Sequence, residues 1–68
     1  MVNIDELKKT IRQSGETINS LSRAIGMDDS TFYRKMKTNG ETFTVGDIDK
    51  IKKALNLDKA RAKAIFFI

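Results

Sequence analysis

Apolar residues recur at helical spacing at the start of the chain, where polar residues flank every apolar position. The spacing i, i+3, i+7 predicts an amphipathic helix over about residues 4–13. Asn3 and Glu6 stand three residues apart, as in a capping box, and Gly15 is suited to end the helix. The apolar positions of this first helix are Ile4, Leu7 and Ile11.

Similar spacing continues in the next stretch, on either side of a glycine. Thr17 is suited to be the N-cap of a second helix, which Gly26 ends in the left-handed conformation that glycine tolerates. Asp28 follows two residues later and supplies a new N-cap, so the second and third helices must turn sharply. The apolar positions are Ile18, Leu21 and Ile25 in the second helix and Phe32 and Met36 in the third.

Turn and cap residues divide the rest of the chain into two further helices. Asn39 and Gly40 form a turn signal. Thr44 then caps a fourth helix, which Asn56 is suited to end, and Asp58 precedes a last helix with the sequence KARAKAIFFI. The pattern therefore predicts an all-α fold of five short helices. The apolar positions of the fourth helix are Val45, Ile48, Ile51 and Leu55.

Composition limits the size and chemistry of this fold. With 68 residues and no proline, residues 1–68 are expected to form one small domain. The chain has no cysteine and no histidine, which excludes disulfides, the common zinc-ligand sets and Ser-His or Cys-His catalytic pairs. We therefore expect no catalytic activity, metal or organic cofactor. No apolar run approaches the roughly 18 residues of a membrane span, and the lack of cysteine favours a reducing cytoplasm.

The chain has an excess of basic residues, and three of them cluster at the end of one predicted helix. Thirteen Lys and Arg residues against nine Asp and Glu residues give a net charge of +4, which favours a polyanionic partner but also accounts for solubility alone. Arg34, Lys35 and Lys37 stand together at the end of the predicted third helix, whereas Asp28 and Asp29 stand at its start. The helix therefore begins acidic and ends basic.

Two helices joined by a short turn at a glycine form a helix-turn-helix, whose second helix can enter the major groove of DNA. The stretch TINSLSRAIGMDDSTFYRKM resembles the helix-turn-helix of the phage Cro and repressor family of transcriptional regulators. The resemblance implies a lambda-repressor-like fold, a helix-turn-helix over about residues 17–37 and a recognition helix over about residues 28–37. The apolar, small and glycine positions of the family pattern are occupied by Leu21, Ser22, Ile25, Gly26, Met27 and Phe32.

The family's base-reading side chains lie in the first two turns of the recognition helix. Arg34 is well suited to this role, because a guanidinium can donate two parallel hydrogen bonds to guanine. Asp29 has two interpretations: it accepts from a cytosine amino group, or it stabilises the helix start electrostatically. Asp28 is expected to be the N-cap, accepting from free N–H groups of the first turn. The resemblance assigns base reading to Asp29, Ser30 and Arg34, with Thr31 and Tyr33 as flanking contacts.

A second set of residues is expected to contact DNA phosphates. Lysines at the end of the recognition helix lie where phosphates pass close, although a solvated basic face is the other interpretation. In the family, the following loop and helix start also bind a phosphate, but here they could equally be a plain connector. Ile18 stands where the family often has a phosphate-binding Gln, and Lys35 stands where it expects an apolar residue. The residues assigned to phosphate binding are Thr17, Asn19, Lys35, Lys37, Asn39, Gly40, Thr42 and Thr44.

The chain ends in four large apolar residues, Ile65 to Ile68. Successive helical residues are 100° apart, so four in a row cannot all face one core. We expect Ile65 or Phe66 to fill the core, and Phe67 and Ile68 to contact a second copy in a weak homodimer that forms on DNA. The alternative is that all four are core or a frayed end.

The sequence therefore predicts a sequence-specific, double-stranded DNA-binding transcriptional regulator of a bacterial or phage-infected cytoplasm. It acts as Cro does or as the DNA-binding part of a repressor. The alternative is a protein-interaction module, such as a phage antirepressor, whose basic face binds an acidic partner instead of DNA. Strong weakening by salt would distinguish DNA binding from that alternative.

Overall fold

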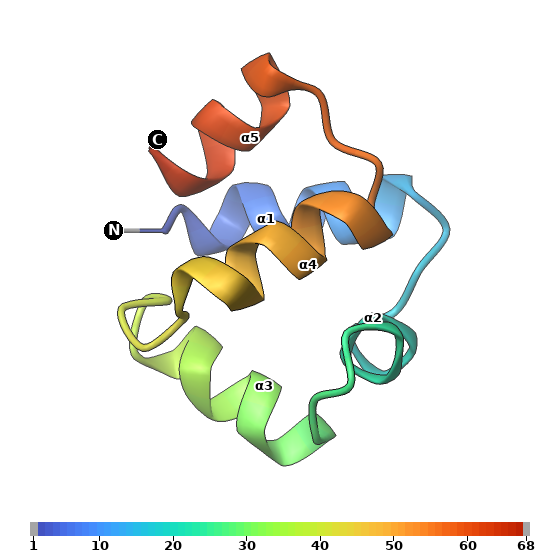
Figure 1. Cartoon of the computed structure of the whole chain (residues 1–68), viewed down its shortest axis with the longest axis vertical. Coiled ribbons are helices and arrows are strands. Elements are labelled where there is room, and N and C mark those ends of the chain that lie inside the picture. Colours follow the sequence, from blue (N-terminus) through green and yellow to red (C-terminus); the bar gives the residue numbers. More distant parts are fainter. Residues whose placement is uncertain (1, 68) are drawn as a thin grey trace.

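The computed structural model describes residues 2–67, which form five α-helices and no strand (Figure 1). The all-α fold of five helices predicted from the apolar pattern is therefore confirmed for these residues. The helix starts fall next to the predicted caps, because the cap residues are the local signal that fixes them. The helices are α1 (Ile4–Gln13), α2 (Ile18–Ala24), α3 (Asp29–Lys37), α4 (Val45–Ala54) and α5 (Lys59–Phe66).

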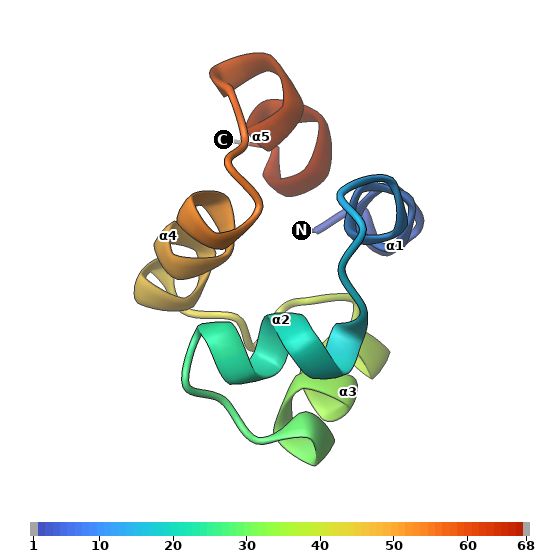
Figure 2. The ribbon, with the colours of Figure 1, turned by 90° about the vertical axis from the view of Figure 1, so that its right-hand side faces the viewer.

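The helices are arranged so that α3 and α5 lie at opposite ends of the molecule. In Figure 1, α5 lies at one end of the longest axis, α1 and α4 cross the middle, and α2 and α3 lie at the other end. Figure 2 shows α2 beside α3 from a second direction. The N-terminal segment connects the two ends, since the Asn3 N–H donates to the Ile65 carbonyl at 2.7 Å and the Val2 N–H donates to the Asn39 carbonyl at 3.4 Å.

Two helices begin with reciprocal capping boxes. In α2, the Thr17 hydroxyl accepts from the Ser20 N–H at 3.0 Å, and the Ser20 hydroxyl accepts from the Thr17 N–H at 2.9 Å. In α4, the Thr44 hydroxyl accepts from the Asp47 N–H at 3.0 Å, and the Asp47 carboxylate accepts from the Thr44 N–H at 3.1 Å. Each box satisfies two backbone donors that the helix itself leaves unpaired, which fixes the start of the helix.

The capping box predicted at the start of α1 forms only in part. The Asn3 side chain accepts from the Glu6 N–H at 3.1 Å, as expected. The return bond is replaced, because the Asn3 N–H donates to the Ile65 carbonyl. The Glu6 carboxylate pairs instead with Arg61 at 3.5 Å and lies 4.0 Å from Lys9. A contact with α5 therefore takes over both groups of the predicted return bond.

Gly26 makes the sharp turn between α2 and α3. Its φ of +71° lies in the left-handed region, and a Cβ placed on it would meet no atom within 4 Å. The glycine is therefore required by backbone conformation and not by space. Around it, the Gly26 N–H donates to the Arg23 carbonyl at 3.1 Å and the Met27 N–H donates to the Ser22 carbonyl at 2.8 Å, which closes the end of α2.

The hydrophobic core is formed by side chains from all five helices. Phe32 of α3 is fully buried, and its ring meets the ring of Phe43 edge to face at a centroid distance of 5.4 Å. The prediction that Val45 belongs to the apolar face of α4 is wrong, because Val45 is 78% exposed. As the first residue of its helix, it lies before the turn that packs on the core. The largest fully buried side chains are Phe32, Leu7, Leu21, Ile51 and Ile65.

The apolar C-terminal stretch divides as the spacing requires. Ile65 and Phe66 are buried, whereas Phe67 is 61% exposed. α5 ends at Phe66 because Phe67 adopts the left-handed conformation, with φ of +56°. Phe67 is therefore outside the core, as predicted. Ile68, the other predicted dimer contact, lies outside the described residues.

Candidate nucleic-acid interface

The outward face of α3 is defined by which side chains the fold buries. Phe32 and Met36 point into the core, so the side chains three or four residues apart on the opposite side face solvent. Tyr33 is 47% exposed, and three neighbouring polar side chains are exposed as well. This outer face consists of Ser30, Tyr33, Arg34 and Lys37.

Arg34 lies at the centre of the outer face of α3. One guanidinium nitrogen lies 3.4 Å from the Thr31 hydroxyl oxygen, to which it donates, and Arg34 forms no ion pair within residues 2–67. Thr31, one of the predicted flanking contacts, is only partly exposed. Its position next to Arg34 suits it to orient the guanidinium, which leaves most of the five N–H donors of Arg34 for a partner.

Asp28 does not form the cap that was predicted for it. It occupies the N-cap position of α3, but its side chain makes no cap hydrogen bond. The carboxylate instead accepts from the Ser30 hydroxyl at 2.6 Å, and both residues are exposed. A serine two residues beyond an N-cap aspartate competes for the carboxylate through a short local bond. The prediction of a capping Asp28 is therefore wrong in its bond, though not in its position.

Asp29 is directed toward α2 and not outward. Its carboxylate accepts from the hydroxyl of Ser22, which is fully buried and also lies 2.9 Å from the Asn19 carbonyl oxygen. Asp29 thus links the two helices of the helix-turn-helix on the side away from Arg34. This contact favours the structural interpretation of Asp29 over the base-reading one.

Lys35 is bound within the fold. Its ammonium lies 2.7 Å from a carboxylate oxygen of Asp47 and 5.9 Å from the centroid of the Phe43 ring. The Lys35 side chain is 20% exposed. The ion pair explains how a lysine can stand at an apolar position of the family pattern, because its stem packs while its charge is neutralised. The Lys35 ammonium is thus bonded within the fold, at a position where phosphate binding was predicted.

The Asp47 carboxylate carries two roles, since it closes the capping box of α4 and binds Lys35 of α3. Its partial burial alone would raise the pKa of Asp47, but hydrogen bonds from the Lys35 ammonium and the Thr44 N–H together outweigh burial and hold that pKa below its usual value. Asp47 is therefore a stabilised anion that joins α3 to the start of α4.

The loop between α3 and α4 contains four of the predicted phosphate contacts. Asn39 and Thr42 are exposed, and the Thr42 hydroxyl lies 3.2 Å from the Thr38 hydroxyl. Thr44 is exposed too, but its hydroxyl and N–H belong to the capping box. Gly40 is different, because it is buried and its N–H donates to the Lys35 carbonyl at 3.0 Å.

Gly40 is needed for close packing. Its φ is +73°, and a Cβ placed on it would lie 2.5 Å from the Cβ of Val2 and 3.2 Å from the Phe43 ring. Any larger residue would force the N-terminal segment away from the loop. The N–H that was predicted to bind phosphate is therefore used within the fold.

The start of α2 presents the two remaining predicted phosphate contacts. Thr17 and Asn19 are both exposed, whereas Ile18 is partly buried and packs against the core. Ile18 thus has a core role in place of the phosphate contact that the family often makes there. Asn19, whose side chain forms no hydrogen bond within residues 2–67, extends from the first turn of α2.

Sequence reasoning missed two exposed residues near this face. Asp28 was assigned to the fold, although the pair Asp28 and Ser30 was a readable local signal for a short side-chain bond. Val45 continued the apolar spacing of α4, so no signal in the sequence distinguished it from a core residue. In the structure, Asp29 bonds within the fold and Asp28 is exposed, which is the reverse of the predicted roles. Val45, next to Thr44, is an additional exposed apolar side chain.

Comparisons with known proteins agree with this geometry. The family profile described as Cro/C1-type HTH DNA-binding domain matches residues 6–59, which include most of α1 and all of α2, α3 and α4. Searches of curated proteins and of solved structures give no match. Within residues 2–67, none of the helices has the length and apolar character needed to cross a membrane.

Proposed function

Because the chain belongs to the Cro/C1-type helix-turn-helix DNA-binding domains, we propose that it is a sequence-specific regulator of transcription that binds double-stranded DNA with α3 in the major groove. The observation that carries the proposal is the outer face of α3, where Ser30, Tyr33 and Arg34 are exposed in the first two turns. The family is one of DNA-binding domains and not of enzymes. Its place of action is the cytoplasm of a bacterial or phage-infected cell.

Base reading is assigned to the outer face of α3. Arg34 donates to O6 and N7 of a guanine, because its guanidinium is exposed and forms no ion pair within residues 2–67. Ser30 contacts a neighbouring base or phosphate, and Tyr33 presents an apolar ring edge to a thymine methyl group. Asp28 replaces Asp29 as the acidic base contact, since its exposed carboxylate can accept from the amino group of a cytosine. Thr31 orients Arg34.

Phosphate binding is assigned to exposed groups on both sides of α3. Lys37 at the exit of the helix supplies a cation that no acid within residues 2–67 neutralises. Asn39, Thr42 and Thr44 contribute polar groups from the following loop. Thr17 and Asn19 do so from the start of α2, where the helix N-terminus favours an anion. Lys35 and Gly40 are left out, because their polar groups are bonded within the fold.

The regulator occupies a two-fold operator as a weak dimer that forms on the DNA. The exposed Phe67 ring at the end of α5 is the apolar group available for a contact between two copies. A single exposed ring is a small contact, so the free chain is expected to be monomeric and the DNA to supply the effective concentration. Deleting Phe67 and Ile68 should abolish cooperative occupancy of two half-sites and leave binding to one half-site intact.

A binding assay on Arg34→Ala tests the proposal. Operator fragments selected from random DNA should bind the parent chain specifically, and Arg34→Ala should weaken that binding by about 1–3 kcal/mol and relax preference at one or two base pairs. Arg34→Lys should restore only part of the loss, because an ammonium cannot bond guanine in the same bidentate way.

Two outcomes would contradict the proposal. If random and selected DNA bind equally and Arg34→Ala changes neither, α3 does not read bases. If the chain binds no DNA at low salt, the helix-turn-helix is a protein-interaction module of the antirepressor kind. The fold alone accommodates either function, so the salt dependence of binding is measured alongside sequence preference.

A further inference from the structure

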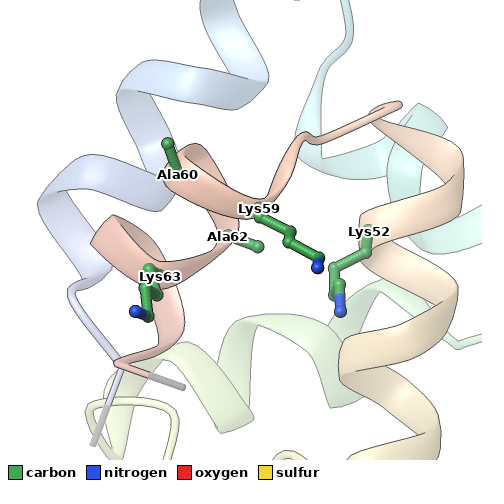
Figure 3. Close-up of a pocket in the computed structure, with 5 residues that line it drawn as sticks. All are labelled: Lys52, Lys59, Ala60, Ala62 and Lys63. Carbon is green, nitrogen blue, oxygen red and sulfur yellow. The ribbon is translucent and has the colours of Figure 1, made fainter.

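A cleft lies between the end of α4 and the outer side of α5 (Figure 3). It has a volume of about 530 Å³, which falls in the usual range of ligand-binding pockets, about 300–1,000 Å³. Ala62 is buried beneath it, with 2% of its surface exposed. Lysine side chains line it from both helices, and Figure 3 shows Lys52 and Lys59 extending into the same space. The lining residues are Lys52, Lys59, Ala60, Ala62 and Lys63.

The three lysines that line the cleft form no ion pair within residues 2–67. The ion pairs within residues 2–67 use Lys9, Lys35 and Arg61 as their cations. Asp58, next to Lys59, accepts from the Arg61 N–H at 2.7 Å as the N-cap of α5, and Asp49, three residues before Lys52, forms no ion pair within residues 2–67. Lys52 and Lys59 extend into the same space (Figure 3), so their like charges repel each other, and an anionic partner relieves this repulsion.

The cleft is remote from the outer face of α3. It borders α5, which lies at the opposite end of the longest axis from α3 (Figure 1). The molecule measures 28 Å along that axis. A duplex seated on α3 therefore leaves this side of the molecule open, and a second partner can bind while DNA is held.

We propose that this cleft binds an acidic segment of another protein, which carries an apolar side chain between its carboxylates. The carboxylates pair with Lys52 and Lys59, and the apolar side chain lies against Ala62 at the base of the cleft. The contact would bring a second protein to a DNA-bound chain, a role that goes beyond DNA binding itself.

The shape of the cleft favours a protein segment over nucleic acid. A phosphate backbone presents charge and sugar but has no apolar side chain to fill a hollow whose base is Ala62. Lysines also lack the planar fork with which arginine holds phosphate bidentately, and they pair equally well with single carboxylates. A second copy of this chain is disfavoured as the occupant by its own net charge of +4.

The experiment follows backbone amide resonances of the full chain during titration with a synthetic helical peptide made of Glu, Leu and Ala. The resonances of Lys52, Lys59, Ala62 and their neighbours should shift and saturate together. The double variant Lys52→Glu, Lys59→Glu should lower the affinity for the peptide by at least about tenfold. The matched control is Lys50→Glu, Lys53→Glu, which reverses two charges on the opposite side of α4, facing α2, and should change affinity less than about twofold.

Titrations with other molecules identify which kind of partner the cleft binds. The same peptide with Gln for Glu should not bind, and inorganic phosphate or random DNA should not shift the cleft resonances. The proposal is overturned if the control variant weakens the peptide as much as the cleft variant, if phosphate or DNA saturates the cleft, or if the cleft variant alters self-association of the free chain. Lys52→Gln, a milder change, gives the same answer should the double variant lose helicity. Arg34→Ala should still bind the peptide, so failure here is distinguishable from failure of DNA binding.

Discussion

The starts of α4 and α3 both carry acidic side chains, but their bonds go to different places. At the start of α4, one carboxylate oxygen of Asp47 accepts both from the Thr44 N–H and from the Lys35 ammonium, so the carboxylate is bonded within the fold. At the start of α3, Asp28 makes no cap bond and accepts only from the exposed Ser30 hydroxyl. The acidic side chain at the start of α4 is therefore bonded within the fold, whereas the one at the start of α3 faces solvent.

The difference separates two tasks of a helix-turn-helix domain. Asp47 and Lys35 join α4 to α3 and so fix the orientation of α3 against the rest of the fold. Asp28 and Ser30 contribute little to that orientation, which makes them available to a partner. Two aspartates near helix starts, Asp47 at the third position of α4 and Asp28 at the N-cap of α3, thus have unequal roles, and the bonds of each side chain show which role it has.

The largest expected effect on stability comes from Asp47, at the start of α4. Asp47→Ala removes the bond to the Thr44 N–H and leaves Lys35 without its partner, so the free energy of unfolding should fall by about 1–2 kcal/mol. Urea denaturation measures the loss. Asp49→Ala, which removes an exposed acid of the same helix, is the matched control and should be near neutral. Equal losses in both variants would mean that helix electrostatics and not the Lys35 pair carries the effect.

A pH series should sharpen the same comparison. The pKa of Asp47 is held below its ordinary value of 3.8 in the folded chain, so the unfolded chain takes up the proton first as the pH falls. The contribution of Asp47 to stability is therefore complete above about pH 5 and is lost progressively as the pH falls through the unfolded and then the folded pKa. Asp47→Asn should flatten the decline between about pH 5 and pH 2. An unchanged slope would show that other carboxylates govern acid unfolding.

Two lysines of α3 allow the comparison to be made in DNA binding. Lys37 is exposed, whereas Lys35 is paired with Asp47. Lys37→Ala should reduce the slope of log affinity against log salt by about 0.9, the value for one phosphate contact. Lys35→Ala should destabilise the fold but leave the slope per folded molecule unchanged. If the two variants lower the slope equally, Lys35 exchanges Asp47 for phosphate when DNA binds.

The sequence predicted the helices well because their signals are local. Apolar spacing and the cap residues Thr17, Thr44 and Asp58 act within one or two turns, and the structure places all three as N-caps. Val45 shows the limit of this reasoning, since its spacing fits the buried stripe but its place at the first position of α4 leaves it exposed. Spacing identifies a face of a helix but not how far along the helix the core extends.

The candidate site was less predictable, because its bonds join distant positions. Asp29 is seven residues from Ser22, and Lys35 is twelve residues from Asp47. No pattern in the sequence predicts either contact. Gly40 was recognised as a turn residue, but its close approach to Val2 at the other end of the chain depends on the folded structure. The resemblance to a family therefore located α3 as the reading helix, while the structure was needed to sort its side chains.

The smallest expected change in stability is that of Asp28→Ala, which tests the role of the start of α3 most directly. Asp28→Ala should lower the free energy of unfolding by less than about 0.5 kcal/mol, since only its electrostatic interaction with the helix start is lost. Asp29→Ala should cost about 1 kcal/mol, because the buried Ser22 hydroxyl loses an acceptor. DNA preference should change in the opposite sense: Asp28→Ala should relax discrimination at one base pair that contains cytosine, and Asp29→Ala should preserve it per folded molecule. Asp28→Asn separates charge from hydrogen bonding, because the amide still accepts but no longer repels phosphate. Thermal melting and selection from random DNA on the same four proteins measure both effects. A stability loss of Asp28→Ala as large as that of Asp29→Ala, with site preference unchanged, would return Asp28 to the fold and leave Ser30, Tyr33 and Arg34 as the reading side chains of α3.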